Sequence, residues 1–192
     1  MLVTVVITTC KRSPEIVERA IKSVIAQTYN DIEIFVVDDS PNSYKYRESV
    51  KKMVETYRNN RVYYIAHTKN LGACVARNTG LDKANGEFIA FLDDDDEWLE
   101  EKLEKQLDAF ENYDNKTALI YCGRITVNDI SGEEAERKAE FYEGFVFDSL
   151  IERNYIGSTS SHRHPFLKSS TPETIPGNHS HDCNKLSACW QP

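Results

Sequence analysis

Four adjacent aspartates, Asp93–Asp96, have the clearest capacity for chemistry of any group in this sequence, and they follow an apolar run, Phe88–Leu92, that predicts a strand. Adjacent carboxylates repel one another, and a bound hard cation relieves that repulsion. Oxygen ligands favour Mg²⁺ or Mn²⁺, held by one or two carboxylates together with substrate phosphates. The alternative is an acidic N-cap, in which Asp95 or Asp96 caps a helix that starts near Glu97. Because other polar clusters also follow strands, we favour the metal.

A second acidic pair, Asp38 and Asp39, follows the apolar run Ile34–Val37. A carboxylate in this position can accept a hydrogen bond from a base N–H or a ribose hydroxyl, as it does in dinucleotide-binding folds. The competing role is an Asx turn before Ser40-Pro41. We expect one aspartate of the pair to form the turn and the other to contact a ligand.

Asn70-x-Gly72 opens a helix that the pattern predicts over residues 73–84, and Arg77 lies one turn into it. Backbone N–H groups at a helix start, together with an arginine, can form a diphosphate cradle. The alternative is an N-cap, with Arg77 paired to a nearby acid. The sequence contains neither the Rossmann glycine fingerprint nor the P-loop pattern, which excludes those two nucleotide sites.

The elements that position these groups alternate between β-branched runs and helical patterns. The predicted strands are Val3–Thr8, Ile32–Val37, Val62–Ala66, Phe88–Leu92 and Ala118–Cys122. The predicted helices follow Ser13-Pro14, include Val50–Tyr57, run from Ala73 to a C-cap at Asn85-Gly86, and carry an apolar stripe of Leu99, Leu103, Leu107 and Phe110. Four βα units in succession predict an α/β fold with a doubly wound, mostly parallel sheet. Ligands bind such sheets beyond the carboxyl ends of the strands, where all these clusters and Thr8-Thr9 fall.

Length and composition narrow the class of protein. The chain has 192 residues, 40% of them hydrophobic, which suits one globular domain. A net charge of −8 argues against nucleic acid as a partner. Five scattered cysteines do not predict a disulfide framework. We expect no transmembrane segment and no signal peptide, and therefore a cytoplasmic location.

The last third of the sequence is less regular. Residues 125–130 and 139–142 predict an antiparallel ribbon around Ser131-Gly132, and residues 145–153 predict a helix. No period is sustained after Ser158. Residues 161–192 hold four of the five histidines and four of the six prolines, with a net charge of +1 against −9 for residues 1–160. We expect a poorly ordered tail, because its histidine and cysteine spacings match no zinc motif.

Taken together, four motifs resemble family 2 glycosyltransferases with the GT-A fold. The motifs are Thr4–Thr9, Ile34–Ser40, Asn70–Gly72 with Ala76–Gly80, and Phe91–Leu99. The resemblance covers roughly residues 1–160, which it identifies as a nucleotide-sugar-binding domain, and it includes Asn154–Ser158. It ends near Ser160, so the tail suggests a truncation, a frameshift or an artificial boundary.

The resemblance also implies roles for individual residues. Thr8 and Thr9 would line the nucleoside pocket, Asp39 would recognise the base, and Arg77 would lie near the diphosphate, with Asn70 also at the donor. Asp93-Asp94-Asp95 would be the D-x-D element: Asp95 holds Mn²⁺ or Mg²⁺ with Asp93, and Asp93 or Asp94 reaches the ribose.

The implied activity is transfer of a sugar, with inversion, from a nucleotide-sugar donor to an acceptor hydroxyl. A UDP-sugar is the first expectation for the donor, and a saccharide or a lipid-linked molecule for the acceptor. The implied role is polysaccharide biosynthesis, with peripheral contact at the inner face of the membrane. Inversion needs a general base, and Glu173 and Asp182 lie in no recognisable context, so we name none. The alternative is a remnant that binds the donor but lacks the acceptor half.

Two other classes of protein fit the sequence less well. Aspartate-dependent phosphotransferases place a D-x-D after the first strand and a small hydroxyl residue two positions beyond it, whereas Glu97 stands at that position here. A receiver domain would explain Asp38-Asp39 but not four aspartates in a row.

Overall fold

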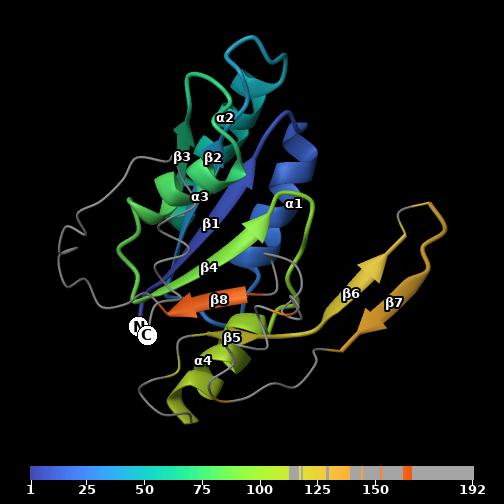
Figure 1. The fold of residues 1–192 in the computed structure, drawn as a ribbon. Helices are drawn as coiled ribbons and strands as arrows, with labels where there is room; N and C mark the ends of the chain where they lie inside the picture. Colours follow the sequence, from blue (N-terminus) through green and yellow to red (C-terminus); the bar gives the residue numbers. More distant parts are fainter. Residues whose placement is uncertain are drawn as a thin grey trace.

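The computed structural model describes residues 1–112, 117, 119–128, 130–138, 144, 152 and 162–165. Its strands are β1 (Val3–Thr9), β2 (Ile32–Asp38), β3 (Val62–Ala66), β4 (Phe88–Asp93), β5 (Ile120–Tyr121), β6 (Arg124–Val127), β7 (Glu134–Arg137) and β8 (His162–Pro165). Its helices are α1 (Pro14–Ile25), α2 (Arg47–Thr56), the 3₁₀ turn η1 (Arg58–Asn60), α3 (Ala73–Leu81) and α4 (Lys102–Asn112). The main sheet has the order β3-β2-β1-β4-β8-β5, and β6 and β7 form a separate ribbon that extends away from it (Figure 1).

Strands β1 to β4 are parallel, so the predicted doubly wound sheet is confirmed. In the register, Thr9 of β1 lies beside Asp38 of β2, and Thr8 lies beside Asp93 of β4. All seven residues of β2 are buried, as the near-continuous apolar run predicts for a strand covered on both faces. The register therefore brings the polar strand ends to one edge of the sheet.

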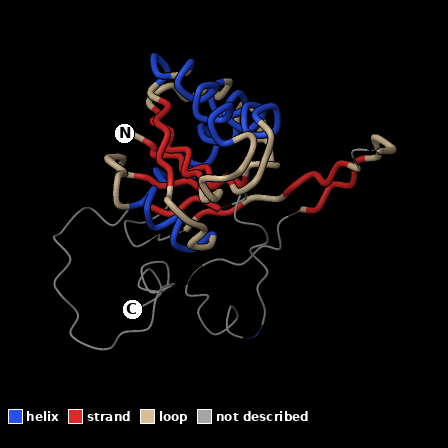
Figure 2. The backbone as a smooth tube through the Cα atoms, turned by 90° about the horizontal axis from the view of Figure 1, so that it is seen from above, coloured by secondary structure: helices blue, strands red, loops and turns tan. Residues whose placement is uncertain are grey.

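Helices cover both faces of the sheet. On one face, α1, α2 and α4 pack against alternate strand residues, among them Val5 and Ile34. On the other face α3 packs against β1 and β2, as Figure 2 also shows the helices on either side of the strands. Here Gly80 is required: a Cβ at this position would lie 2.4 Å from Val6 Cγ1. This close approach packs the last turn of α3 directly against β1.

Helix α3 ends at Leu81, three residues before the predicted end at Ala84 and its C-cap at Asn85-Gly86. Asn85 bonds instead to the buried carboxylate of Glu33, through its backbone N–H at 2.7 Å and its side-chain amide at 3.1 Å. Thr4 also donates to Glu33, at 2.6 Å. The Asn-Gly pair therefore closes the opposite edge of the sheet rather than a helix.

The prediction of a helix starting near Glu97 is wrong, because α4 begins at Lys102. The preceding segment is held outside a helix by polar groups of α1 and its C-terminal end. The backbone N–H of Trp98 donates to Ser23 Oγ at 3.1 Å, and Gln27 Nε2 donates to the Leu99 carbonyl at 2.8 Å. Leu99, predicted to be part of the apolar stripe, is 72% exposed. The alternative in which Asp95 or Asp96 caps a helix that starts near Glu97 is therefore wrong.

The expectations for residues beyond 123 agree with the structure in part. The antiparallel ribbon is confirmed, with its second strand at Glu134–Arg137 instead of 139–142. The short β8, in the segment where no regular structure was predicted, pairs antiparallel with β4 and β5. The helix predicted over 145–153 and most of residues 161–192 lie outside the described residues. In the described ranges, no helix is long and apolar enough to span a membrane.

Candidate functional site

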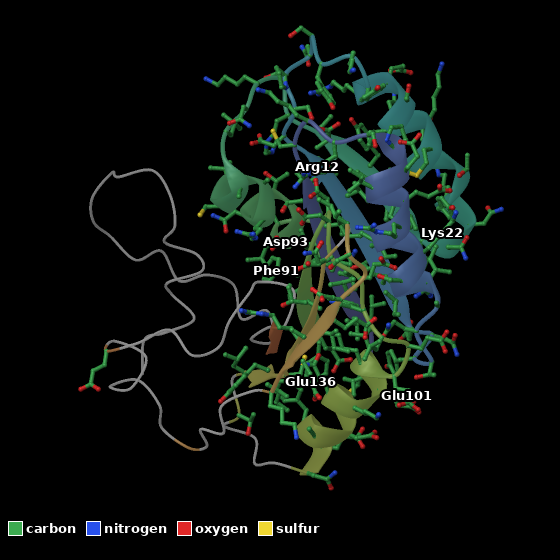
Figure 3. All side chains as sticks on the ribbon, turned by 90° about the vertical axis from the view of Figure 1, so that its right-hand side faces the viewer. Arg12, Lys22, Phe91, Asp93, Glu101 and Glu136 are labelled. Atoms are coloured by element: carbon green, nitrogen blue, oxygen red, sulfur yellow. The ribbon has the colours of Figure 1, made fainter. Side chains whose placement is uncertain are left out.

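The polar ends of β1 and β4 form one open pocket of about 230 Å³. It is lined by Thr8, Thr9, Cys10, Arg12, Asp93, Asp94 and Asp95. In Figure 3, Arg12 and Asp93 lie at the same end of the central strands, although 81 positions separate them in sequence. The sheet thus brings together three of the predicted site residues, Thr8, Thr9 and Asp93, from β1 and β4, and Asp94 and Asp95 join them from the turn after β4.

Two arginines neutralise the carboxylates of this pocket. Arg12 Nε donates to Asp94 Oδ1 at 3.1 Å, and its Nη2 donates to Asp95 Oδ2 at 2.6 Å. Arg77 Nη2 donates to Asp93 Oδ1 at 2.9 Å, which is the acid pairing considered for Arg77. Burial raises the pKa of Asp94, while the neighbouring Thr9 hydroxyl and the charge of Arg12 act in the opposite direction. Two arginine charges therefore offset most of the charge of three aspartates.

Arg12 is a site residue that the sequence analysis missed. The negative charge of Asp94 raises the pKa of Arg12, which stays a cation. Lys11, just before it, has a φ of +54°, so the chain turns sharply after β1 and returns the arginine over the strand ends. The position of Arg12 in the sequence could have indicated its role, because it closely follows β1 as the aspartates follow β4.

The Thr9 hydroxyl is a second feature of this pocket. It is buried beside the Asp94 carboxylate, yet it makes no hydrogen bond of normal geometry among the described residues. Buried hydroxyls in native proteins nearly always have a partner, so an unpaired one at a pocket wall points to a ligand or a water.

One of the two roles expected of the pair Asp38 and Asp39 is visible in the structure, the Asx turn. Asp38 Oδ1 accepts from the backbone N–H of Ser40 at 2.8 Å, so the predicted Asx turn belongs to Asp38. Its Oδ2 accepts from the Tyr64 hydroxyl at 2.7 Å, and burial together with this bond raises the pKa of Tyr64. Ligand contact by Asp39 remains a prediction.

Asp39 is joined to the loop before α3. Its carboxylate accepts from the backbone N–H groups of Leu71 and Gly72, each at 2.8 Å. Gly72 has a φ of +92°, a conformation that favours glycine. Asn70 Nδ2 donates to the Asp39 carbonyl at 3.1 Å and to Cys10 Sγ at 3.2 Å. The backbone N–H groups of Leu71 and Gly72, at the predicted diphosphate cradle, therefore donate to Asp39 of the same chain.

The donor set of the pocket suits a hard cation, because Asp93, Asp94 and Asp95 offer only carboxylate oxygens. Asp95 is 52% exposed in its side chain, which leaves it accessible to an ion. Within the part of the chain that the structure describes, however, no three histidine, cysteine or acidic side chains are arranged to hold a metal. A cation would bind among carboxylates that already pair with Arg12 and Arg77.

The fold and pocket define a nucleotide-diphospho-sugar transferase architecture of the GT-A type, with acids at the end of β4. Comparison with known proteins agrees: the family model for glycosyl transferase family 2 matches residues 4–176, beyond the predicted limit near residue 160. The chain belongs to glycosyl transferase family 2.

Its relatives include bacterial glycosyltransferases. The putative teichuronic acid biosynthesis glycosyltransferase TuaG of Bacillus subtilis is 34% identical over 154 residues, which is 79% of this chain and 58% of TuaG. The UDP-Glc:alpha-D-GlcNAc-diphosphoundecaprenol beta-1,3-glucosyltransferase WfgD of Escherichia coli is 34% identical over 115 residues, 60% of this chain and 43% of WfgD.

Solved structures share the fold. S. aureus TarS 1–349 in complex with UDP has a TM-score of 0.63 at 20% identity, over 86% of this chain and 47% of that one. The mannosyltransferase PcManGT of Pyrobaculum calidifontis, in complex with GDP-Man and Mn²⁺, has a TM-score of 0.54 at 25% identity, over 62% and 34%. The matched regions cover between 34% and 58% of the lengths of these four proteins, so this chain corresponds to only part of each of them.

Proposed function

We propose that this protein is a glycosyltransferase that binds a nucleoside-diphosphate sugar at the carboxyl edge of its sheet and transfers the sugar to an acceptor hydroxyl with inversion. The observation that carries the proposal is the pocket in which Thr8, Thr9 and Asp93–Asp95 meet Arg12. Family membership and the UDP, UDP-GlcNAc and GDP-Man complexes of the structural neighbours support the donor class.

In this proposal Thr8 and Thr9 line the nucleoside site, and the unpaired Thr9 hydroxyl finds its partner on the ligand. Asp39 accepts from the base, and Asn70 fixes the wall between Asp39 and Cys10. Asp93 or Asp94 accepts from the ribose hydroxyls. Arg77, held at Asp93, brings a positive charge to the diphosphate.

Asp95 and Asp93 are the residues proposed to hold Mn²⁺ or Mg²⁺. A bound cation would supply charge neutralisation for the diphosphate as it leaves. Arg12 pairs with Asp95 and Arg77 pairs with Asp93, so the two arginines offset the charges of these aspartates before an ion binds. That arrangement reduces the repulsion that adjacent carboxylates would otherwise produce.

The second candidate is donor binding without transfer. Inversion needs a base for the acceptor proton, and we assign no described carboxylate to that role. The relatives extend beyond the region matched here. The donor pocket alone does not supply contacts to an acceptor. The roles of TuaG and WfgD support a polysaccharide or a lipid-linked molecule as the acceptor. We also propose a cytoplasmic location with peripheral contact at a membrane.

The test is calorimetric titration of UDP, dTDP and GDP with and without Mn²⁺, followed by assays of donor hydrolysis and transfer. We expect Mn²⁺ to tighten nucleotide binding, and Asp95→Asn to abolish that tightening. The matched control is Asp96→Asn. It removes the same charge at the next position, from a residue that does not line the pocket. Absence of nucleotide binding in the unaltered chain would contradict the donor site. Metal-dependent binding without turnover would favour the second candidate.

A further inference from the structure

His67 lies in the loop after β3 and has no role in the function proposed so far. Its imidazole ring connects two elements: Nδ1 lies 2.7 Å from Asp39 Oδ1, and Nε2 lies 2.9 Å from the hydroxyl of Thr79 in α3. The side chains of His67 and Asp39 are only 9% and 4% exposed. A histidine fixed at both ring nitrogens in a nearly buried position orients whatever it contacts.

The direction of the hydrogen bond to Asp39 follows from the proton inventory. The Thr79 hydroxyl can both donate and accept, so its bond with His67 Nε2 places no condition on the proton at Nδ1. The carboxylate of Asp39 can only accept, so Nδ1–H donates to it. His67 is thus anchored on α3 and donates a hydrogen bond to one particular oxygen of Asp39.

The acceptor capacity of Asp39 is then nearly used. A carboxylate oxygen accepts about two hydrogen bonds. Oδ1 accepts from His67 Nδ1 and from the backbone N–H of Leu71, while Oδ2 accepts from the backbone N–H of Gly72. One acceptor position remains, and it is on Oδ2.

A single acceptor discriminates between nucleobases. Uracil and thymine present one imide N–H between two carbonyl groups, which one oxygen satisfies. Guanine presents N1–H and the N2 amino group side by side, and pairs best with both oxygens of a carboxylate. A guanine at Asp39 would therefore leave one of its donors unpaired in a nearly buried site, which is costly.

We propose that His67 is a positioning residue that occupies Oδ1 of Asp39 and so makes the site prefer a uridine or thymidine diphosphate to a guanosine diphosphate. This inference rests on the proposed donor site, in which Asp39 faces the base. It adds a base preference that membership of the fold does not decide, since the structural neighbours include both UDP and GDP-Man complexes.

The test compares two variants of the full 192-residue chain. His67→Leu removes the donor to Oδ1, whereas His67→Asn places an amide N–H near the position of Nδ1 and loses only the bond to Thr79. Dissociation constants for UDP and GDP are measured by calorimetry with Mn²⁺ present. We expect the unaltered chain to prefer UDP, the GDP-to-UDP ratio to fall about tenfold in His67→Leu, and the ratio to be preserved in His67→Asn.

The ratio separates positioning from folding, because a merely structural role would weaken both nucleotides alike. An unchanged ratio in His67→Leu, or an equal loss for both nucleotides, overturns the role of His67 while leaving the donor site intact. Failure of the unaltered chain to bind either nucleotide overturns the proposed function as well. If His67→Leu does not fold, Thr79→Val releases the other end of the ring and should shift the ratio in the same direction by less.

Discussion

At the scale of single residues, Asp38 and Asp39 show how two identical neighbours acquire different roles. Asp38 is satisfied by its own turn and by Tyr64, whereas Asp39 joins the loop before α3 to His67. The sequence predicted that one aspartate would form an Asx turn before Ser40-Pro41, which Asp38 does. Ligand contact by Asp39 stays a prediction. The sequence did not predict His67, because the contact joins residues 28 positions apart and no local pattern marks it.

Gly72 allows a residue-scale prediction with a matched control. Its φ of +92° and that of Gly132 at +70° both disfavour side chains, and a Cβ at either position meets no atom within 4 Å. Gly72→Ala and Gly132→Ala should therefore each lower the free energy of unfolding by about 1–3 kcal/mol, measured by urea denaturation. Only Gly72 donates to Asp39, so only Gly72→Ala should weaken UDP binding, by about tenfold. Equal binding by both variants would contradict the link between this loop and the site.

At the scale of elements, the parallel strands were predictable because β-branched runs between helical patterns have few alternatives. The start of α4 was not, since Leu99 has the right spacing for the helical stripe but is not packed. What decides the boundary is tertiary: Ser23 and Gln27 of the α1 region bind the backbone of residues 98, 99 and 103. Propensity and period carry no information about such distant partners.

The contact between α1 and α2 gives a pH-dependent prediction. The Tyr57 hydroxyl, at the end of α2, donates to Glu18 at 2.6 Å, and this bond lowers the pKa of Glu18. A lowered carboxyl pKa stabilises the fold above the pKa of the unfolded chain, and the stabilisation is lost as pH falls. Tyr57→Phe should therefore raise the pKa of Glu18, and its loss of stability should be largest above about pH 5 and shrink toward about pH 3.

The measurement is a ¹³C NMR titration of the Glu18 carboxyl group, with urea denaturation at each pH. Tyr63→Phe, which removes a hydroxyl from a β3 residue stacked on Phe35, is the control and should leave the Glu18 titration unchanged. A Tyr57→Phe variant whose stability loss is constant with pH would show that packing, not the hydrogen bond, joins the two helices.

At the scale of the whole molecule, the formal charge of −8 does not describe the pocket. In the pocket, the acids at the end of β4 pair with Arg12 and Arg77. Arg12 lies in the loop after β1, and Arg77 lies in α3. The net charge argues against a nucleic-acid partner, but it does not predict where positively charged side chains lie close together. That placement depends on the sheet order, which joins elements from across the first hundred residues.

The predicted boundary near residue 160 can be tested on shortened chains. Strand β8 covers the edge of β4 through Phe88, Ile89 and Ala90. A chain ending at residue 160 lacks β8 and exposes that edge, so it should unfold at lower temperature and aggregate on heating. A chain ending at residue 176 keeps β8 and the whole family match, and should unfold like the full chain. Thermal unfolding with light scattering decides; identical behaviour of the two shortened chains would support a boundary at 160.

The place of β8 in the sheet also has a consequence for the order of events during synthesis. Strands β1 to β4 pair with partners that emerge from the ribosome within the first half of the chain. The outer edge of β4 must wait for roughly 70 further residues before β8 is made. The pairing with β8 is therefore the last one to become available to β4. The nascent chain carries a finished carboxyl edge of the parallel strands while the outer edge of β4 is still open to chaperones.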